Sequence, residues 1–342
     1  MDIIQIANII KQSGGNLYLV GGAVRDEFLK RPVNDEDYCV TGLTSEEFLK
    51  LFPNAIIKGK QFEVYEIDKK EFALARTEKK KIESSENVHK NFIVSTHKSI
   101  TIEEDLARRD ITINSIAKNV LTNEIIDPFN GIQDIKNKII RATTEAFSED
   151  PLRVYRVARF ASELGFIVEA TTMQMMKNVK HELDKLPGER VFNELKKVLV
   201  SKNPAIFFEI LKQADLLDVH FKEINNLIGA LQPEYCHPEG DAFNHTMQVI
   251  EYVSKELAEK EKQNSNITKI KYEILFSALV HDLGKGVTPK EEYPHHYLHD
   301  INGVNLVADL GKRLKLPSTW IKSGKVTSKE HMRAGKFYEM RL

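Results

Sequence analysis

Residues 17–40 read LYLVGGAVRDEFLKRPVNDEDYCV, and this stretch indicates the fold and the chemistry of the first part of the chain. Its apolar start predicts a buried strand, and Gly21 and Gly22 leave room for a ligand because neither carries a Cβ atom. The residues that follow predict a helix whose first N–H groups face an anion, with Arg25 one turn along as a fixed cation. We therefore predict that Gly21, Gly22 and Arg25 bind phosphate.

The end of the same stretch, residues 33–40, alternates as a strand does and fits an amphipathic helix poorly. In a strand, Asp35 and Asp37 point to the same face and repel each other unless a cation lies between them. Hard oxygen ligands beside a phosphate site suit Mg²⁺ that holds a nucleoside triphosphate. Glu71 is within reach as a third carboxylate, but we do not assign it. Each motif alone is typical of an ordinary turn or a solvated strand, whereas the pair favours a catalytic metal site.

Composition limits the class of protein. The chain has 342 residues, 42% hydrophobic and 29% charged, which is typical of a soluble globular protein with several domains. It contains no apolar run near the ~20 residues that span a bilayer, and its start lacks a signal-peptide pattern. Cys39 and Cys236 are its only cysteines, which favours a reducing compartment. We expect a cytoplasmic protein without membrane contact. Because the net charge is −1, any binding of nucleic acid is expected to use local basic clusters such as Lys196-Lys197.

Strand-like and helical segments alternate up to about residue 140, and helical periodicity continues after it. The segment between the early strands and the next motif, residues 76–101, is polar and predicts a flexible loop. The other expected elements are strands near 55–57, 62–67, 71–75 and 125–126, and helices over 45–51 and 113–120.

The glycine and aspartate motifs together resemble the head of the polymerase-β-like nucleotidyltransferases. Within that superfamily they are most similar to the class II tRNA nucleotidyltransferases, which include the bacterial CCA-adding enzymes and their poly(A) polymerase relatives. The resemblance implies an α+β fold with an α/β head, an all-helical neck and body, and a helical HD domain. The implied boundaries are 1–140 for the head, 141–200 for a neck that recognises the base, 201–236 for a tRNA-binding body, and 237–342 for an incomplete HD domain.

A second motif in the head, Arg108-Arg109-Asp110, resembles the family element whose second arginine contacts the triphosphate. This role falls on Arg109, because a guanidinium fork matches phosphate oxygens and Asp110 can hold that fork in place. We expect Arg108 to lie on a surface helix beside Glu104.

Residues 147–160, FSEDPLRVYRVARF, place one carboxylate and a series of guanidinium groups at intervals of three residues along a predicted helix. A carboxylate that accepts and a guanidinium that donates match the edges of C and A, and mismatch those of U and G. The resemblance implies that Asp150 and Arg153 read the base, and that Arg156 and Arg159 support the phosphates or the template. Alternatively, Asp150 is only the N-cap of this helix.

His245, the adjacent His281-Asp282 and the histidine-rich run 294–300 resemble an HD phosphohydrolase domain. Neighbouring His and Asp can reach one metal, with His245 as a third ligand, which implies a second divalent transition metal besides Mg²⁺. The late carboxylate ligand of such domains is not evident. The alternative is that these histidines are ordinary helix residues.

These motifs predict an enzyme of tRNA processing and RNA repair that adds C, C and A to tRNA 3′ ends without a template. Its partners are expected to be tRNA, ATP and CTP, its reaction a two-metal phosphoryl transfer, and its state a monomer or weak homodimer. We also expect the HD domain to have an accessory phosphohydrolase activity. The alternatives are a poly(A) polymerase or A-only adder, an HD phosphohydrolase with an RNA-binding head, and an RNA-binding scaffold.

Overall fold

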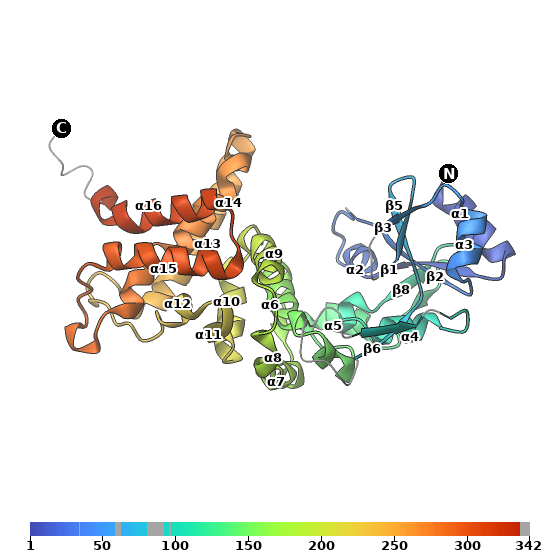
Figure 1. The fold of residues 1–342 in the computed structure, drawn as a ribbon, viewed down its shortest axis with the longest axis horizontal. Coiled ribbons are helices and arrows are strands. Elements are labelled where there is room, and N and C mark those ends of the chain that lie inside the picture. Colours follow the sequence, from blue (N-terminus) through green and yellow to red (C-terminus); the bar gives the residue numbers. More distant parts are fainter. Residues whose placement is uncertain (34, 59–62, 81–91, 96, 336–342) are drawn as a thin grey trace. The chain divides into compact units, whose positions relative to one another are not determined.

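A computed structural model describes residues 1–33, 35–58, 63–80, 92–95 and 97–335 (Figure 1). The chain divides into two compact units. The first comprises Met1–Arg153 with Ile167–Met175, and the second comprises Val154–Phe166 with Met176–Leu342. The first unit is built around a sheet and the second is helical, which confirms the predicted α+β class.

The first unit contains a seven-stranded sheet in the order β3-β4-β5-β2-β1-β8-β9. Strand β1 lies between β2 and β8 and is antiparallel to both, and β2 is parallel to β5. Because β1 is buried along nearly its whole length, its continuous apolar run is what the sheet requires at this position. The strands are β1 (Asn16–Val20), β2 (Asp37–Thr41), β3 (Ile56–Lys58), β4 (Val64–Ile67), β5 (Lys70–Leu74), β8 (Ala117–Asn119) and β9 (Ile125–Ile126).

Two sequence-based predictions about the seven-stranded sheet are wrong. Strand β2 begins at Asp37 and not at residue 33, so Asp35 precedes the strand and the alternation argument does not apply to it. Residues 113–120 form a short 3₁₀ turn and β8 instead of a helix. Ala117 pairs with Val20 of β1, and this long-range pairing decides between strand and helix where a short apolar run cannot.

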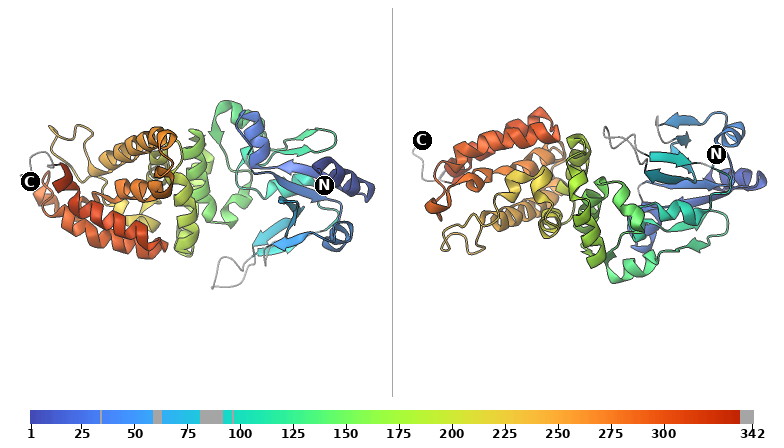
Figure 2. Two further views of the ribbon diagram at one scale, coloured as in Figure 1. Left: turned by 90° about the horizontal axis from the view of Figure 1, so that it is seen from above. Right: turned by 60° about the horizontal axis from the view of Figure 1, so that its bottom comes forward.

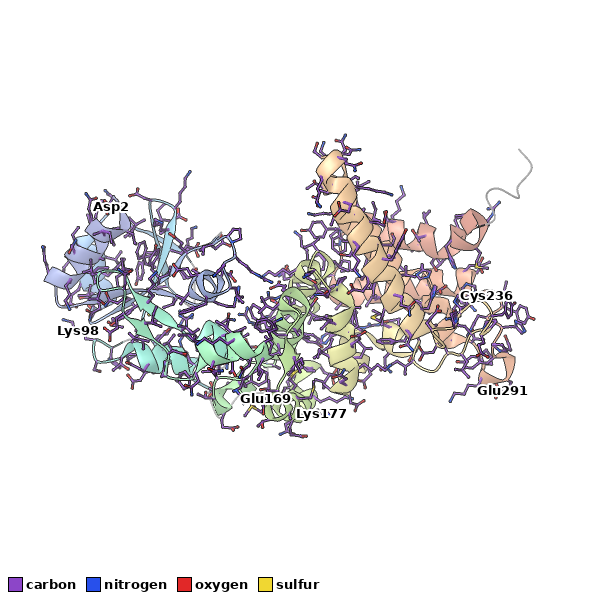
Figure 3. The ribbon with its side chains drawn as sticks, turned by 180° about the vertical axis from the view of Figure 1, so that it is seen from behind. Asp2, Lys98, Glu169, Lys177, Cys236 and Glu291 are labelled. Atoms are coloured by element: carbon purple, nitrogen blue, oxygen red, sulfur yellow. The ribbon has the colours of Figure 1, made fainter. Side chains whose placement is uncertain are left out.

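Several helices of the first unit carry local capping signals. Asp2, labelled in Figure 3, accepts a hydrogen bond from the Gln5 N–H and caps the first helix. The helices are α1 (Ile3–Gln12), α2 (Gly22–Phe28), α3 (Ser45–Leu51), α4 (Ile102–Ala107), α5 (Gly131–Asn137) and α7 (Ala170–Asn178), the last of which continues into the second unit.

Where a flexible loop was predicted, β6 (Thr77–Lys80) pairs with β7 (Phe92–Ser95) as an antiparallel ladder. The central part of the predicted loop, residues 81–91, lies outside the described residues. A further strand pair joins β10 (Ile139–Ile140) to β11 (Ile167–Val168), so strands also occur after residue 141.

The second unit is a set of packed helices, seen from two further directions in Figure 2. Helices α13 and α14, α14 and α16, and α15 and α16 pack against one another. Their bounds are α6 (Leu152–Leu164), α8 (Lys180–Leu183), α9 (Gly188–Leu199), α10 (Pro204–Gln213), α11 (Leu217–His220), α12 (Lys222–Asn225), α13 (Ala242–Gln263), α14 (Ile267–Val280), α15 (His299–Leu314) and α16 (Ser318–Gly335), with the short 3₁₀ helices η4 (Leu283–Val287) and η5 (Lys290–Glu292). Among the described residues, no helix combines the length and apolar character that crossing a bilayer requires.

Candidate functional sites

The carboxylates predicted to hold Mg²⁺ lie at the start of β2. Asp37 is directly opposite Glu71 across the parallel β2–β5 pair, and both line a pocket of about 150 Å³ together with Arg109. Burial of the carboxylate raises the pKa of Asp37. The positive charge of Arg109 lowers this pKa, and the negative charges of Glu71 and Asp35 raise it further. A bound cation would relieve this repulsion. Glu71, which was not assigned from the sequence, is therefore part of the acidic cluster.

Arg109 lies between this acidic cluster and the glycine turn. Its Nη2 donates to buried Asp105 at 3.1 Å, and its buried Nε has no hydrogen-bond partner among the described residues. Gly21 adopts φ +71°, and a Cβ atom there would lie 3.0 Å from Nη1 of Arg109. The structure thus brings Gly21, Arg109 and Asp37 together, although they are far apart in the sequence.

Arg25 of α2 makes side-chain contacts with Asp26 and Asn114. It is buried, and its guanidinium donates to the Asp26 carboxylate through Nε and Nη2. Its Nη1 donates to Asn114 Oδ1 at 2.8 Å. Asp26 balances the charge of Arg25, and the group ties α2 to the turn that contains Asn114. A direct phosphate contact from Arg25 stays a prediction, as does one from the Gly22 backbone.

Asp150 and Arg153 stand at the beginning of α6. The Asp150 carboxylate accepts from the Leu152 N–H at 3.1 Å, so it caps the helix as the alternative interpretation expected. Arg153 is 7% exposed and donates to the carbonyl oxygens of Ala146 and Arg108, each at 2.6 Å. These contacts fix the plane of the guanidinium. Reading of the base by this pair stays a prediction.

The two later arginines of α6 have structural contacts within the second unit. Arg159 is buried and donates to Glu194 of α9 at 2.5 Å and to Glu163 at 2.7 Å. Both Arg159 and Arg156 also lie against the Phe160 ring, at 4.0 and 5.5 Å from its centre. Arg159 therefore links α6 to α9, and support of phosphates by either arginine stays a prediction.

The second unit gathers His245 of α13 and His281 and Asp282, at the end of α14, into one cluster. Asp282 Oδ2 lies 3.2 Å from His281 Nε2, 3.8 Å from His245 Nε2 and 2.7 Å from Lys285 Nζ. Burial acts to raise the pKa of Asp282, but His281, His331 and Lys285 hold it well below its usual range. An ionised carboxylate and converging imidazoles are donors that a divalent transition metal accepts.

His299 and His331 complete the surroundings of Asp282, and the sequence-based assignment missed both. His299 lies within the histidine-rich run 294–300, but His331 stands in α16 without any local signal. A late histidine thus faces Asp282 where a late carboxylate was sought. Gly284 permits this arrangement, because a Cβ atom there would overlap the carbonyl oxygen of His299.

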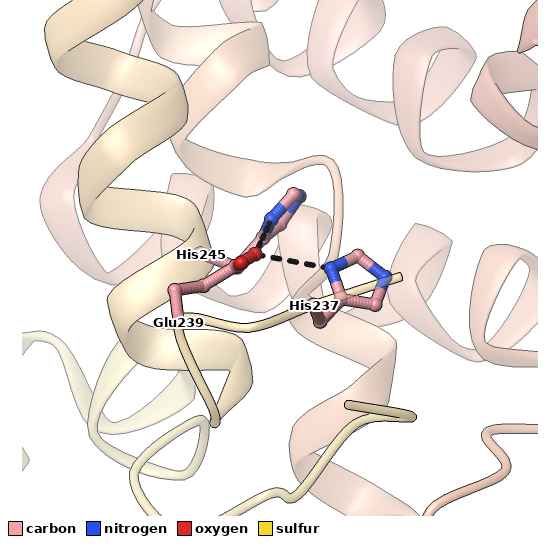
Figure 4. A group of neighbouring side chains, drawn as sticks. All are labelled: His237, Glu239 and His245. Atoms are coloured by element: carbon pink, nitrogen blue, oxygen red, sulfur yellow. Dashed lines mark hydrogen bonds and ion pairs between the residues drawn. The ribbon is translucent and has the colours of Figure 1, made fainter. Parts of the chain in front are cut away.

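His237 and Glu239 precede α13, and the Glu239 carboxylate lies between the rings of His237 and His245 (Figure 4). One oxygen of Glu239, Oε1, lies 2.6 Å from His245 Nδ1 and 3.0 Å from His237 Nδ1. Burial acts to raise the pKa of Glu239, but hydrogen bonds from its own backbone N–H and the two histidines lower it to about 2. The carboxylate therefore holds the proton of His245 on Nδ1 and leaves Nε2 to face Asp282.

A basic groove of about 630 Å³ crosses α9 of the second unit, lined by Lys196, Lys197 and Tyr272 among others. Lys196 Nζ lies 5.3 Å from the centre of the Tyr272 ring. The predicted Lys196-Lys197 cluster thus stands beside an aromatic ring, a combination that suits an RNA backbone with an unstacked base.

Three known families match successive parts of the chain. Residues 17–141 match "Poly A polymerase head domain", residues 165–228 match "Probable RNA and SrmB- binding site of polymerase A", and residues 242–336 match "HD domain". The chain is 42% identical over 332 residues to the multifunctional CCA protein of Shewanella frigidimarina, with 95% of this chain and 76% of that protein covered. It is also 42% identical over 337 residues to the multifunctional CCA protein of Haemophilus influenzae, with 95% and 77% covered.

Solved structures of CCA-adding enzymes share the fold. The complex of a CCA-adding enzyme with ATP is 20% identical to this chain and has a TM-score of 0.64. The alignment covers 100% of this chain and 73% of the chain of that enzyme. The Thermotoga maritima CCA-adding enzyme complexed with tRNA is 19% identical, with a TM-score of 0.56 and coverage of 98% and 80%. At these identities the likeness concerns the fold alone.

Proposed function

The chain belongs to the family of multifunctional CCA proteins, and we propose that it adds C, C and A to the 3′ ends of tRNA from CTP and ATP with Asp35 and Asp37 as catalytic metal ligands. The observation that carries the assignment is the 42% identity over 95% of the chain. The grouping of Asp37, Glu71 and Arg109 around one pocket supports the choice of site.

The donor set fits Mg²⁺, because the carboxylate oxygens of Asp37 and Glu71 line one pocket and a hard divalent cation prefers such oxygen ligands. When bound, Mg²⁺ ions lower the pKa of the tRNA 3′-hydroxyl and neutralise the triphosphate. Asp35 and Asp37 would hold these ions. Arg109 would donate its guanidinium N–H groups to phosphate oxygens, and Gly21 leaves the space in which that contact forms.

Base selection is assigned to Asp150 and Arg153. The two carbonyl contacts of Arg153 hold its guanidinium in one plane, and rigid donors discriminate better than mobile ones. In this proposal a carboxylate acceptor beside a guanidinium donor accepts C and A, and it leaves unpaired polar groups against U and G. Arg156 and Arg159 would act on the template through the position of α6.

Addition to a defined tRNA tests the proposal. A tRNA that ends at the discriminator base is incubated with CTP, ATP, UTP or GTP singly and with CTP and ATP together. We expect two C residues with CTP alone, a complete CCA end with both, and no extension with UTP or GTP. Incorporation of ATP alone onto this tRNA, without use of CTP, would instead support the poly(A) polymerase or A-only alternative.

We further propose that His245, His281 and Asp282 bind a divalent transition metal and that this centre hydrolyses phosphate esters. Burial lowers the pKa of His245, which favours the neutral ring that a metal requires. Hydrolysis of p-nitrophenyl phosphate with Co²⁺ tests this function: His281→Ala should abolish it and leave CCA addition unchanged. Equal hydrolysis by His281→Ala would contradict the assignment. With tRNA and nucleotides as substrates, we propose that the protein acts in the cytoplasm as a monomer or weak homodimer.

A further inference from the structure

Arg313 lies in α15, within residues 242–336 that match an HD domain, and its side chain binds a segment outside that match. Its Nη1 donates to the carbonyl oxygen of His220 at 3.0 Å and to one oxygen of Glu223 at 2.8 Å, and its Nη2 donates to the other oxygen of Glu223. The Glu223 side chain is 1% exposed. Because a carboxylate buried to this degree needs a cation, the pair fixes Arg313 to α11 and α12.

His220, at the end of α11, in turn holds a residue of α6. Nδ1 of His220 is 2.7 Å from the hydroxyl oxygen of Tyr155, and both side chains are buried. The edge of the His220 ring also packs against the Tyr155 ring, with 5.6 Å between the ring centres. The side chain of Arg313 is therefore connected to α6 through a single residue.

The main chain of Arg313 supports the other helix that binds α6, which is α9. Gly188 begins α9, and a Cβ atom there would lie 2.0 Å from the carbonyl oxygen of Arg313. A glycine at this position lets α9 approach α15 this closely. Helix α9 carries Glu194, which accepts a hydrogen bond from Arg159 of α6. One residue of the HD domain thus contacts both elements that bind α6.

These two contacts lie on one side of α6. Tyr155 and Arg159 are four residues apart, so their side chains stand on the same face of the helix. Arg153, two residues before Tyr155, is turned by about 200° from it around the helix axis. Because an α-helix is stiff over two turns, its rotation at Tyr155 and Arg159 sets the direction in which Arg153 leaves it.

We propose that Arg313 is a positioning residue for nucleotide selection: by holding α9 and α11, it fixes the rotation of α6 and thereby the direction of Asp150 and Arg153. The inference rests on the proposed assignment of base selection to these two residues. Groups that discriminate by hydrogen bonds must keep their geometry within about 0.5 Å, and a helix released on one side loses that accuracy. The HD domain then contributes to CCA addition independently of any hydrolysis.

Nucleotide discrimination by the full chain tests this role. A tRNA that ends at the discriminator base is extended in single turnover with CTP or with UTP, and the ratio of the two rates is compared between variants. Arg313→Met keeps an unbranched side chain but removes its hydrogen bonds. We expect the ratio to fall about 10-fold or more, because a displacement of about 1 Å can cost about 100-fold in rate. A smaller share of folded protein would lower both rates equally and leave the ratio unchanged.

A second variant separates positioning from stability. Arg313→Met alone leaves Glu223 buried without its cation, whereas Glu223→Gln combined with Arg313→Met removes that charge as well. Because neither variant restores the donor to the His220 carbonyl oxygen, both should lose discrimination to the same extent. Lys312→Gln, which changes the exposed neighbour in α15, should keep the parent ratio.

The outcomes distinguish failure of this inference from failure of the proposed base selection. A parent ratio in Arg313→Met would overturn the inference. A parent ratio in the double variant would also overturn it, since the single variant would then act through the unpaired charge of Glu223. In both cases a parent that prefers CTP keeps the proposed base selection. A parent that uses UTP as readily as CTP would remove base selection itself, and the positioning role with it.

Discussion

The head and the HD domain both place aspartates at a proposed metal site, but in opposite surroundings. Asp37 lies at the start of β2, where desolvation raises its pKa, Arg109 opposes the rise, and Glu71 and Asp35 add to it. Asp282 is 2% exposed, and His281, His331 and Lys285 hold its pKa well below the usual range. The head carboxylate is thus flanked by two further carboxylates and one arginine, and the HD carboxylate by histidines and a lysine.

This difference indicates when each metal binds. The head offers carboxylates and Arg109, so its donor set is completed only when a triphosphate supplies further oxygens. The HD cluster already contains nitrogen and oxygen donors with fixed tautomers. We infer that the ions of the head arrive with the nucleotide, whereas the ion of the HD domain binds without substrate.

The largest effect is expected from removal of a head carboxylate. Asp37→Ala should lower the rate of nucleotide addition about 10³-fold or more, because an unshielded triphosphate loses several kcal/mol of transition-state stabilisation. The adjacent Glu36, which pairs with Lys70, supplies the control: Glu36→Gln should stay within about twofold of the parent. Single-turnover addition to tRNA measures both. Normal addition by Asp37→Ala would remove this residue from the metal site.

The equivalent change in the HD domain should affect only hydrolysis. Asp282→Asn takes the charge from the centre of the cluster and should reduce p-nitrophenyl phosphate hydrolysis about 10²-fold or more, since metal binding needs the carboxylate. CCA addition by the same preparation should be unchanged and shows that the chain is folded. Asp300→Asn, next to His299, is the matched control. Loss of both activities together would mean that Asp282 stabilises the whole chain instead of a local site.

An intermediate effect is expected from the carboxylate behind His245. Glu239→Gln keeps the shape but removes the charge that makes His245 a strong ligand, and should weaken Co²⁺ binding about 10- to 100-fold. Glu234→Gln, exposed on the same segment, should bind Co²⁺ as the parent does. Equal affinities for both variants would assign Glu239 a purely structural role.

The smallest effect is expected at the basic groove. Replacing Lys196 and Lys197 together by Gln should weaken tRNA binding several-fold and reduce the slope of log affinity against log salt by about one per lysine. Lys290→Gln in the HD domain serves as the control. An unchanged salt slope in the double variant would place the tRNA backbone elsewhere.

Features fixed by neighbouring residues were predicted well from the sequence. Strand β1, the turn at Gly21 and helix α3 follow from an apolar run, a glycine and a capping box that act within a few residues. The pairing of Asp37 with Glu71, in contrast, depends on which strands become neighbours. It is set by the sheet order, which no local pattern encodes.

Errors arose where distant contacts outweighed local preference. Ala117 joins the sheet because it pairs with Val20 of β1, although residues 113–120 were predicted to be helical. His331 reaches Asp282 only through the packing of α16. Its position in the sequence carries no ligand signal of its own, and periodicity alone cannot find it.

The difference between the two metal sites is tested most directly by Mn²⁺ binding to the metal-free full chain. The electron paramagnetic resonance signal of free Mn²⁺ is measured with and without CTP. We expect tight binding without CTP that is lost in Asp282→Asn, and further binding that requires CTP and is lost in Asp37→Ala. Tight binding without CTP that disappears in Asp37→Ala and persists in Asp282→Asn would contradict it.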